Sequence, residues 1–200
     1  MTAWIEQLIA DMGYIGIALL MFLENVFPPI PSELIMPLAG FTSARGELNI
    51  YGVIAAGTIG TFFGALIWYY VGHLLDEDKL RRWTGRHGRW LGMSRRELEK
   101  VDYWFDTKGR WAVLFGRVVP TIRTLISVPA GAFRMPLRTF VPYTFFGSLA
   151  WNTLLTFVGR GLGENYEAVE SYIGPVSMAI IAAMVLGYLY RVATFEPDQR

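Results

Sequence analysis

The chain has 200 residues, a formal net charge of +1 and 53% hydrophobic residues, with a mean hydropathy of +0.34. Soluble domains hold about 45–50% apolar residues even when glycine is counted, and the excess here lies in blocks on either side of one charged segment, which indicates a membrane protein of a single domain. The sequence has no cysteine, which excludes disulfides, thiolate nucleophiles and cysteine metal sites. We expect no metal and no other cofactor.

Residues 1–12 are predicted to form a short amphipathic helix, because their apolar side chains recur at helical spacing. They lack a basic leading segment and carry Glu6 and Asp11, so they do not resemble a cleavable signal peptide. Two placements stay open for this helix, one at the membrane interface and one packed on the rest of the protein.

Residues 13–44 hold two apolar stretches separated by ENVFPPIPSE, which contains Pro28, Pro29 and Pro31. Each stretch is shorter than the roughly 20 residues that cross a bilayer. A proline inside a helix removes a hydrogen bond, and broken backbone at membrane depth is tolerated only where protein or a water-filled cavity covers it. The pattern therefore predicts a re-entrant helical hairpin that faces inward.

Residues 50–75 are apolar throughout and predict a spanning helix. The segment 76–110 that follows is rich in lysine and arginine, so the positive-inside rule places it in the cytoplasm. Tryptophans and leucines between its charges predict an amphipathic segment on the membrane surface; a solvated charged loop is the alternative.

Residues 111–135 form a second interrupted region, broken by Arg117, Pro120, Arg123 and Pro129. Arg134 and Arg138 follow it, so we expect this region to leave the cytoplasm and return there as a second re-entrant hairpin, with Gly131 at a close backbone approach.

Residues 139–160 and 174–191 predict two more spanning helices, which leave the C-terminus in the cytoplasm. The predicted fold is an all-α polytopic membrane protein with two oppositely oriented re-entrant hairpins and three transmembrane helices. Paired, proline-interrupted segments of this kind are typical of inverted repeats, although two unrelated re-entrant loops would give the same pattern.

Four charges lie where lipid-compatible sequence should be neutral. Glu24 and Glu33 flank the first break, and Arg117 and Arg123 flank the second. Each charge at the centre of a bilayer costs about 2.5–3.5 kcal/mol on the lenient insertion scale. The pattern predicts that the acids and arginines neutralise one another across a shared cavity. Purely structural salt bridges are the alternative, although buried pairs contribute little stability.

The residue types favour an anionic ligand that exchanges with protons. A guanidinium binds phosphate through paired hydrogen bonds, and a half-helix that begins at Thr121 after Pro120 would offer free backbone N–H groups to the same anion. A phosphate head group whose tail stays in lipid fits such a site. Glu24 and Glu33 would take up and release protons as they alternate between paired and unpaired states.

These motifs resemble the DedA family, the bacterial branch of the SNARE-associated Golgi protein (VTT domain) superfamily. The similarity covers residues 13–163 and rests on FLENVFPPIPSE, GTFFGALIWYYVG, FGRVVPTIRTLISVPAGAFRM, GSLAWN and VGRGLG. It implies transport of undecaprenyl phosphate or a phospholipid across the bacterial cytoplasmic (inner) membrane, dependent on the proton-motive force. It assigns the acidic pair to Glu24 and Glu33 and the arginine pair to Arg117 and Arg123. Many relatives carry an acid at the position of Ala65, whereas Tyr69 is retained.

The leading hypothesis is therefore a lipid-phosphate translocase, or flippase, with Arg117, Arg123 and Thr121 as the phosphate site and Tyr69 and Asn152 in support. The alternative is a proton-coupled exporter of small amphipathic cations. An intramembrane enzyme such as a lipid phosphatase is disfavoured because no nucleophile lies beside an oriented base. The expected partners are membrane lipid and protons, without nucleic acid; a homo-oligomer is left open.

Overall fold

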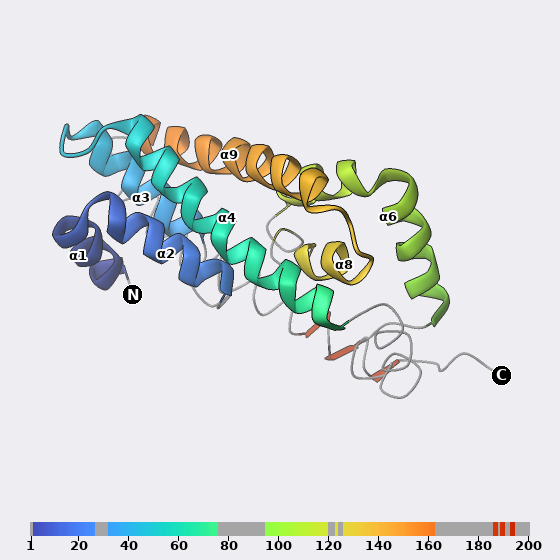
Figure 1. Ribbon diagram of the computed structural model, residues 1–200. Helices are drawn as coiled ribbons and strands as arrows, with labels where there is room; N and C mark the ends of the chain where they lie inside the picture. The colour runs from blue at the N-terminus through green and yellow to red at the C-terminus, as the bar shows by residue number, and fades with distance from the viewer. Residues whose placement is uncertain are drawn as a thin grey trace.

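The computed structural model describes residues 2–26, 32–75, 95–119, 123 and 126–162, with short pieces at 186–187, 189–190 and 193–194. These residues form helices joined by turns, and the described part contains no strand, as expected of an all-α protein. Figure 1 shows an elongated bundle in which two long helices run side by side and shorter helices cover their two ends. The chain expected to form the third spanning helix, 174–191, lies almost entirely outside the described residues.

One end of the bundle is built from the N-terminal helices. Helix α1 (Thr2–Met12) is followed after Gly13 by α2 (Tyr14–Val26), and α3 (Ser32–Ala44) follows the first proline cluster. Gly13 adopts a φ of 55°, which allows the tight turn between α1 and α2. The loop after α3 ends at Asn49, whose Oδ1 accepts a hydrogen bond from the backbone N–H of Tyr51 and caps the next helix.

The two long helices are α4 (Ile50–Leu75) and α9 (Leu137–Leu162), each of 26 residues. At the end opposite to α1, they are covered by α6 (Arg95–Gly116) and the short α8 (Ser127–Ala132). Helix α6 continues through residue 110, so the expected amphipathic segment and the first arm of the expected second hairpin share one helix. The sequence becomes apolar at Trp111, but no proline interrupts the backbone before Pro120.

Within the described ranges, α4 is the one helix that is long and apolar enough to cross a membrane by length and composition. Helix α9 has the same length but carries more polar residues. Each of these two helices, and also α2, carries large exposed apolar side chains along one face of the helix. These are Ile15, Leu19, Leu23, Ile59, Phe63, Ile67, Tyr70, Leu74, Phe146, Leu154 and Phe157. Exposed apolar faces of this extent indicate contact with lipid.

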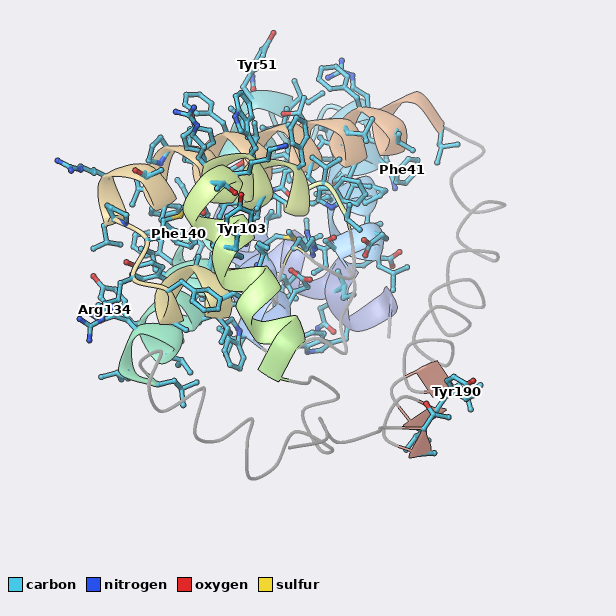
Figure 2. The ribbon with its side chains drawn as sticks, turned by 90° about the vertical axis from the view of Figure 1, so that its right-hand side faces the viewer. Phe41, Tyr51, Tyr103, Arg134, Phe140 and Tyr190 are labelled. Carbon is cyan, nitrogen blue, oxygen red and sulfur yellow. The ribbon has the colours of Figure 1, made fainter. Side chains whose placement is uncertain are left out.

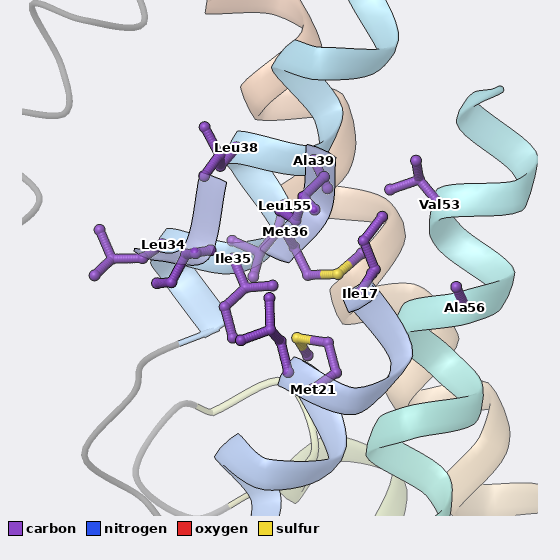
Figure 3. Close-up of a cluster of buried hydrophobic side chains, with 13 residues drawn as sticks. Ile17, Met21, Leu34, Ile35, Met36, Leu38, Ala39, Val53, Ala56 and Leu155 are labelled. Carbon is purple, nitrogen blue, oxygen red and sulfur yellow. The ribbon is translucent and has the colours of Figure 1, made fainter. Parts of the chain in front are cut away.

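The interior of the N-terminal end is an apolar cluster (Figure 3). It gathers Ile17 and Met21 of α2, Ile35 and Met36 of α3 and Leu155 of α9. A second cluster lies at the other end and includes Tyr69 of α4, Val113 of α6 and Phe140 of α9. The polar residues described below lie in the same interior.

The short helices pack across the two halves of the chain. Helix α3 lies on α9, where a methyl group added to Gly40 would be 2.1 Å from the carbonyl oxygen of Thr156, and one added to Gly159 would be 1.9 Å from that of Pro37. Only glycine permits backbones to approach so closely.

Helix α8 lies on α4 in the same manner. A methyl group at Gly131 would be 1.9 Å from the carbonyl oxygen of Tyr69, and one at Gly72 would be 2.1 Å from that of Val128. The contacts between α3 and α9 have the same spacing as those between α8 and α4. In both regions, the carbonyl that meets a glycine belongs to the residue three positions before the glycine of the opposite helix. We call these two contact regions the α3–α9 seam and the α8–α4 seam.

Candidate functional site

Glu24 enters the interior because it continues the buried face of α2. Ile17, Leu20, Met21 and Glu24 follow at helical spacing, and all are buried. The carboxylate is therefore carried inward by the same side of the helix that builds the apolar core.

The carboxylate of Glu24 forms a salt bridge with Arg123. Nη2 of Arg123 donates to Oε1 of Glu24 across 99 residues of sequence, and the two residues are 4% and 3% exposed. The other carboxylate oxygen, Oε2, has no hydrogen-bond partner in the described chain. The structure thus joins one acid of the first interrupted region to one arginine of the second.

Arg117 is the largest fully buried side chain of the described residues, at 1% exposure. It directly follows α6, its Nη2 donates to Oγ of Ser127 at 2.5 Å, and its guanidinium carbon lies 5.9 Å from the centre of the Phe140 ring. Gly147 of α9 makes room for its side chain, because a methyl group there would be 2.7 Å from Cβ of Arg117. Nε and Nη1 have no partner among the described residues.

Glu33, the second residue of α3, belongs to the same charged group. Its carboxylate interacts electrostatically with Glu24, which also senses Arg123 and Arg117. Oε1 of Glu33 is buried without a hydrogen-bond partner in the described region. The four charges expected to meet therefore do lie near one another, but only Glu24 and Arg123 form an ion pair there, and the expected second pair is absent.

Tyr69 of α4 packs on Phe140, the ring that faces Arg117, and Gly131 of α8 lets the backbone of Tyr69 approach closely. The hydroxyl of Tyr69 donates to the carbonyl oxygen of Met135 at 2.5 Å, and its ring lies 4.5 Å from that of Phe140. Pro129 lies in the first turn of α8, where its missing N–H costs no helical hydrogen bond. Pro28, Pro29, Pro31, Pro120 and Thr121 lie outside the described residues.

Asn152 of α9 lies in the interior, and its Nδ2 donates to Oγ1 of Thr61 at 3.4 Å. Its Oδ1 has no partner in the part of the chain that the structure describes. The same holds for further buried polar atoms on α2, α4 and α9, namely those of Asn25, Thr58, Thr144 and Ser148. In lipid, such groups cannot turn to bulk water.

Sequence reasoning missed several residues that build this site. Ser127 supplies the hydroxyl that orients Arg117, Phe140 supplies the ring beneath its guanidinium, and Gly147 supplies the space. A signal for α9 was present in the sequence, because Thr144, Ser148 and Asn152 recur every four residues on a helix that should be apolar.

Two pockets lie at opposite ends of α9. One of about 370 Å³ is lined by Arg110, Arg134 and residues up to Thr139 at the start of the helix. The other, of about 510 Å³, is lined by Phe157 and Arg160 near its end and by residues 48–51. Arg134 adopts a φ of 52°, an uncommon backbone conformation for a residue other than glycine.

No group of three or more histidine, aspartate or glutamate side chains in the described ranges could hold a metal ion. The chemistry available at the site is that of a buried ion pair, an additional guanidinium with two unpaired nitrogens and a neighbouring carboxylate. Such a set can bind an anion and exchange its partners.

The VTT domain model matches residues 30–161, about two thirds of the chain. The chain is a VTT-domain protein. Its expected place in the DedA family is thereby confirmed, and with it the prediction of a membrane protein. No solved structure matches the chain.

Several curated relatives match this VTT-domain protein over most of its length. An undecaprenyl phosphate transporter A of Staphylococcus aureus is 34% identical over 186 residues, which cover 93% of this chain and 92% of the relative. The protein of the same name from Bacillus subtilis is 31% identical over 92% of this chain and 89% of its own. An alkaline phosphatase-like protein of Lactococcus lactis is 41% identical over 93% of this chain and 86% of its own. The first two names support a role of this family in lipid-phosphate transport.

Proposed function

We propose that this VTT-domain protein is a flippase that moves a lipid phosphate, of the undecaprenyl phosphate class, between the leaflets of the cytoplasmic membrane. The observation that carries the proposal is Arg117, whose guanidinium is fully buried and has two nitrogens, Nε and Nη1, without a partner in the described chain. A buried cation with unsatisfied N–H groups is costly, and phosphate oxygens would accept charge-assisted hydrogen bonds from the unpaired N–H groups of Nε and Nη1.

Arg123 is the second phosphate ligand in this proposal, but at rest Glu24 occupies it. A phosphate bound at Arg117 would compete with Glu24 for Arg123, and protonation of Glu24 would remove that competition. Glu33 lies close enough to repel the charge of Glu24, and would accept a proton in the same cycle. This arrangement gives transport a dependence on the proton-motive force.

The reciprocal seams favour an inverted repeat of two re-entrant hairpins. The short helix of each half, α3 or α8, packs on the long helix of the other half through glycines of equal spacing. Gly60 on α4 and Gly147 on α9 extend the match. Each lies 12 residues before the seam glycine of its own helix, and each closely contacts the first of the three helices in its half, α2 for Gly60 and α6 for Gly147. In transporters with such repeats, the substrate site lies at the interface between the halves, where the four charges meet.

Purified protein in liposomes tests the proposal directly. A fluorescent short-chain polyprenyl phosphate should change leaflets faster in the presence of the protein, as read by a membrane-impermeant quencher. Arg117→Gln should lower the rate about tenfold to a hundredfold, the range for loss of a hydrogen-bonded charge worth about 1.5–3 kcal/mol. The matched control is Arg45→Gln, which removes an exposed arginine paired with Glu47. Equal rates for the wild type and Arg117→Gln would refute the assignment.

The same liposomes separate the alternatives. A cation exporter would need free acids, whereas Glu24 is paired with Arg123; transport of amphipathic cations without lipid exchange would nevertheless establish it. The name of the Lactococcus relative calls for one further assay. Release of inorganic phosphate from the polyprenyl phosphate would identify an enzyme in place of a translocase.

A further inference from the structure

Helix α9 carries a row of buried polar residues that the charged site does not use. Thr144, Ser148, Asn152 and Thr156 follow one another at four-residue spacing, and none is more than 2% exposed. Because four residues are slightly more than one helical turn, such side chains form a continuous ridge inclined to the helix axis. We call this ridge the polar row. The next residue in the series is Arg160.

The polar row is poorly explained as structural support. Oγ1 of Thr144, Oγ of Ser148 and Oδ1 of Asn152 are buried and have no hydrogen-bond partner within the described ranges. Thr156 differs, because its hydroxyl donates to the carbonyl oxygen of Asn152 at 2.7 Å. Buried polar groups without partners destabilise a membrane protein, so their repeated placement on one ridge indicates a ligand or water that occupies the row at another stage.

The row begins beside Arg117. The guanidinium of Arg117 faces Phe140, and its Cβ meets Gly147, so Thr144 and Ser148 lie on the turns of α9 next to it. The other end of the row reaches Arg160, an exposed arginine with no ion-pair partner in the part of the chain described.

Arg160 opens into the pocket of about 510 Å³ that Phe157 and residues 48–51 also line. From Thr144 to Arg160, α9 rises about 24 Å, which is more than half of the roughly 40–45 Å thickness of a whole bilayer. The row is therefore long enough to connect a buried site with the polar surface of the membrane.

In the described conformation, α3 and α4 cover the polar row. Gly40 of α3 meets the carbonyl oxygen of Thr156, Nδ2 of Asn152 donates to Thr61 of α4, and Nε1 of Trp151 donates to Oγ of Ser32 at 3.4 Å. The α3–α9 seam would have to part for a polar group to pass along it. Hydrogen bonds of 3.4 Å are long and weak, so little holds the seam closed besides apolar packing.

We propose that the polar row is the path of a phosphate monoester head group between Arg117 and a second binding site at Arg160. This inference rests on the proposed function and adds to it a route and an outer site. The hydroxyls and the amide of the row replace water around the phosphate in transit, while the lipid tail stays in the surrounding bilayer. Arg160 then holds the head group at the surface of the outer leaflet.

The exchange assay tests the outer site. Arg160→Gln should lower the rate of lipid exchange about fivefold, the effect of losing one exposed charge contact, while Arg45→Gln at the same end of the bundle keeps the wild-type rate. Exchange by the wild type with no effect of Arg160→Gln would overturn the second site and leave the proposed function intact. No exchange by the wild type would instead overturn the proposed function.

Thiol labelling tests the route, because the chain has no cysteine of its own. Ser148→Cys and Asn152→Cys should react with a membrane-impermeant maleimide during turnover, whereas Leu155→Cys, on the same helix but in the apolar cluster, should not. Melting temperatures verify that each variant is folded. Equal protection of all three cysteines during turnover would overturn the route.

A cysteine at Tyr51 identifies the source of the phosphate. Tyr51 lines the outer pocket and points away from the bundle at 77% exposure (Figure 2). Short-chain polyprenyl phosphate in the liposomes should slow the labelling of Tyr51→Cys, and inorganic phosphate should not. Equal protection by inorganic phosphate would assign the pocket to the free ion, and no protection by either would overturn the site.

Discussion

Arg123 donates a hydrogen bond to Glu24, and this buried contact joins residues 99 positions apart in the sequence. It is the one ion pair formed by the four interior charges in the described chain, and it leaves Arg117 and Glu33 without a charged hydrogen-bond partner. The interior therefore holds one ion pair beside two charged side chains that are not ion-paired. Binding of an anion or protonation of an acid can change which of these groups are paired.

Breaking this pair from one side should destabilise the protein. Glu24→Ala leaves the guanidinium of Arg123 buried without its counter-ion, which costs about 3–5 kcal/mol. The melting temperature of the detergent-purified protein measures the loss. The double variant Glu24→Leu with Arg123→Leu should recover most of the stability, because no buried charge remains unpaired, yet it should not exchange lipid. A double variant as unstable as Glu24→Ala would contradict this account of the pair.

Replacing Arg117, in contrast, should not destabilise the protein. Its Nε and Nη1 have no partner in the described residues, so Arg117→Gln removes a charge whose burial Ser127 and Phe140 compensate only in part. We expect the free energy of unfolding to stay within about 1 kcal/mol of the wild type, or to rise, while lipid exchange falls about tenfold to a hundredfold. Chemical or thermal unfolding of the same preparation that is used for transport provides the measurement. A large loss of stability would show that Arg117 serves mainly to hold the fold together.

Ser127 should act through Arg117. Its hydroxyl accepts the hydrogen bond that fixes the guanidinium over Phe140, and Ser127→Ala removes that bond at a cost of about 1 kcal/mol. Lipid exchange should fall severalfold, since the phosphate ligand is no longer held in one position. Ser43→Ala is the matched control, because Ser43 is also buried but its hydroxyl donates to the backbone of its own helix, at Gly40. Equal exchange by the two variants would argue against a positioning role.

The seams should tolerate no side chain. Gly131→Ala places a methyl group 1.9 Å from the carbonyl oxygen of Tyr69, and Gly40→Ala does the same at Thr156, so each should destabilise by more than about 2 kcal/mol through overpacking. Gly161→Ala is the control on α9, where nothing lies within 4 Å of the added methyl group. That change should be neutral or stabilising by up to about 1 kcal/mol. The comparison requires only melting curves, and similar curves for Gly131→Ala and Gly161→Ala would refute the close approach.

Tyr69→Phe should cost about 1 kcal/mol, because it leaves the buried carbonyl of Met135 without its donor. Tyr70→Phe, at the next position but half exposed, should leave the melting temperature unchanged. A Tyr69→Phe protein as stable as the wild type would mean that another group satisfies the carbonyl.

The long helix α4 could be predicted from sequence to its terminal residues, since an unbroken apolar run leaves a helix as the only way to satisfy its backbone. Helix α6 could not, because its change from charged to apolar surface at Trp111 reflects its surroundings, whereas the helix itself continues until Gly116. Hydrophobicity indicates what a segment contacts and does not by itself mark where a helix ends; nor does every proline, since α3 and α9 continue through Pro37 and Pro142.

The charged site, too, could be predicted only in part from the sequence. The four charges were evident from sequence because each is costly in lipid. Their pairing was not, because it depends on how α2, α3 and α6 are placed relative to one another. The preference of Arg117 for Ser127 over Glu33 is a matter of three-dimensional position, and neutral residues such as Phe140 and Gly147 carry no chemical signal until their neighbours are known.

The crossed packing of α3 and α8 also bears on how the protein is made. Gly40 emerges from the ribosome 119 residues before Gly159, and at about 5–20 residues per second this delay is about 6–24 seconds. During that time, α3 has no α9 on which to lie, and its side around Gly40 lacks its native neighbour. The α8–α4 seam can form before α9 is made, whereas the α3–α9 seam must wait until α9 has been translated as far as Gly159.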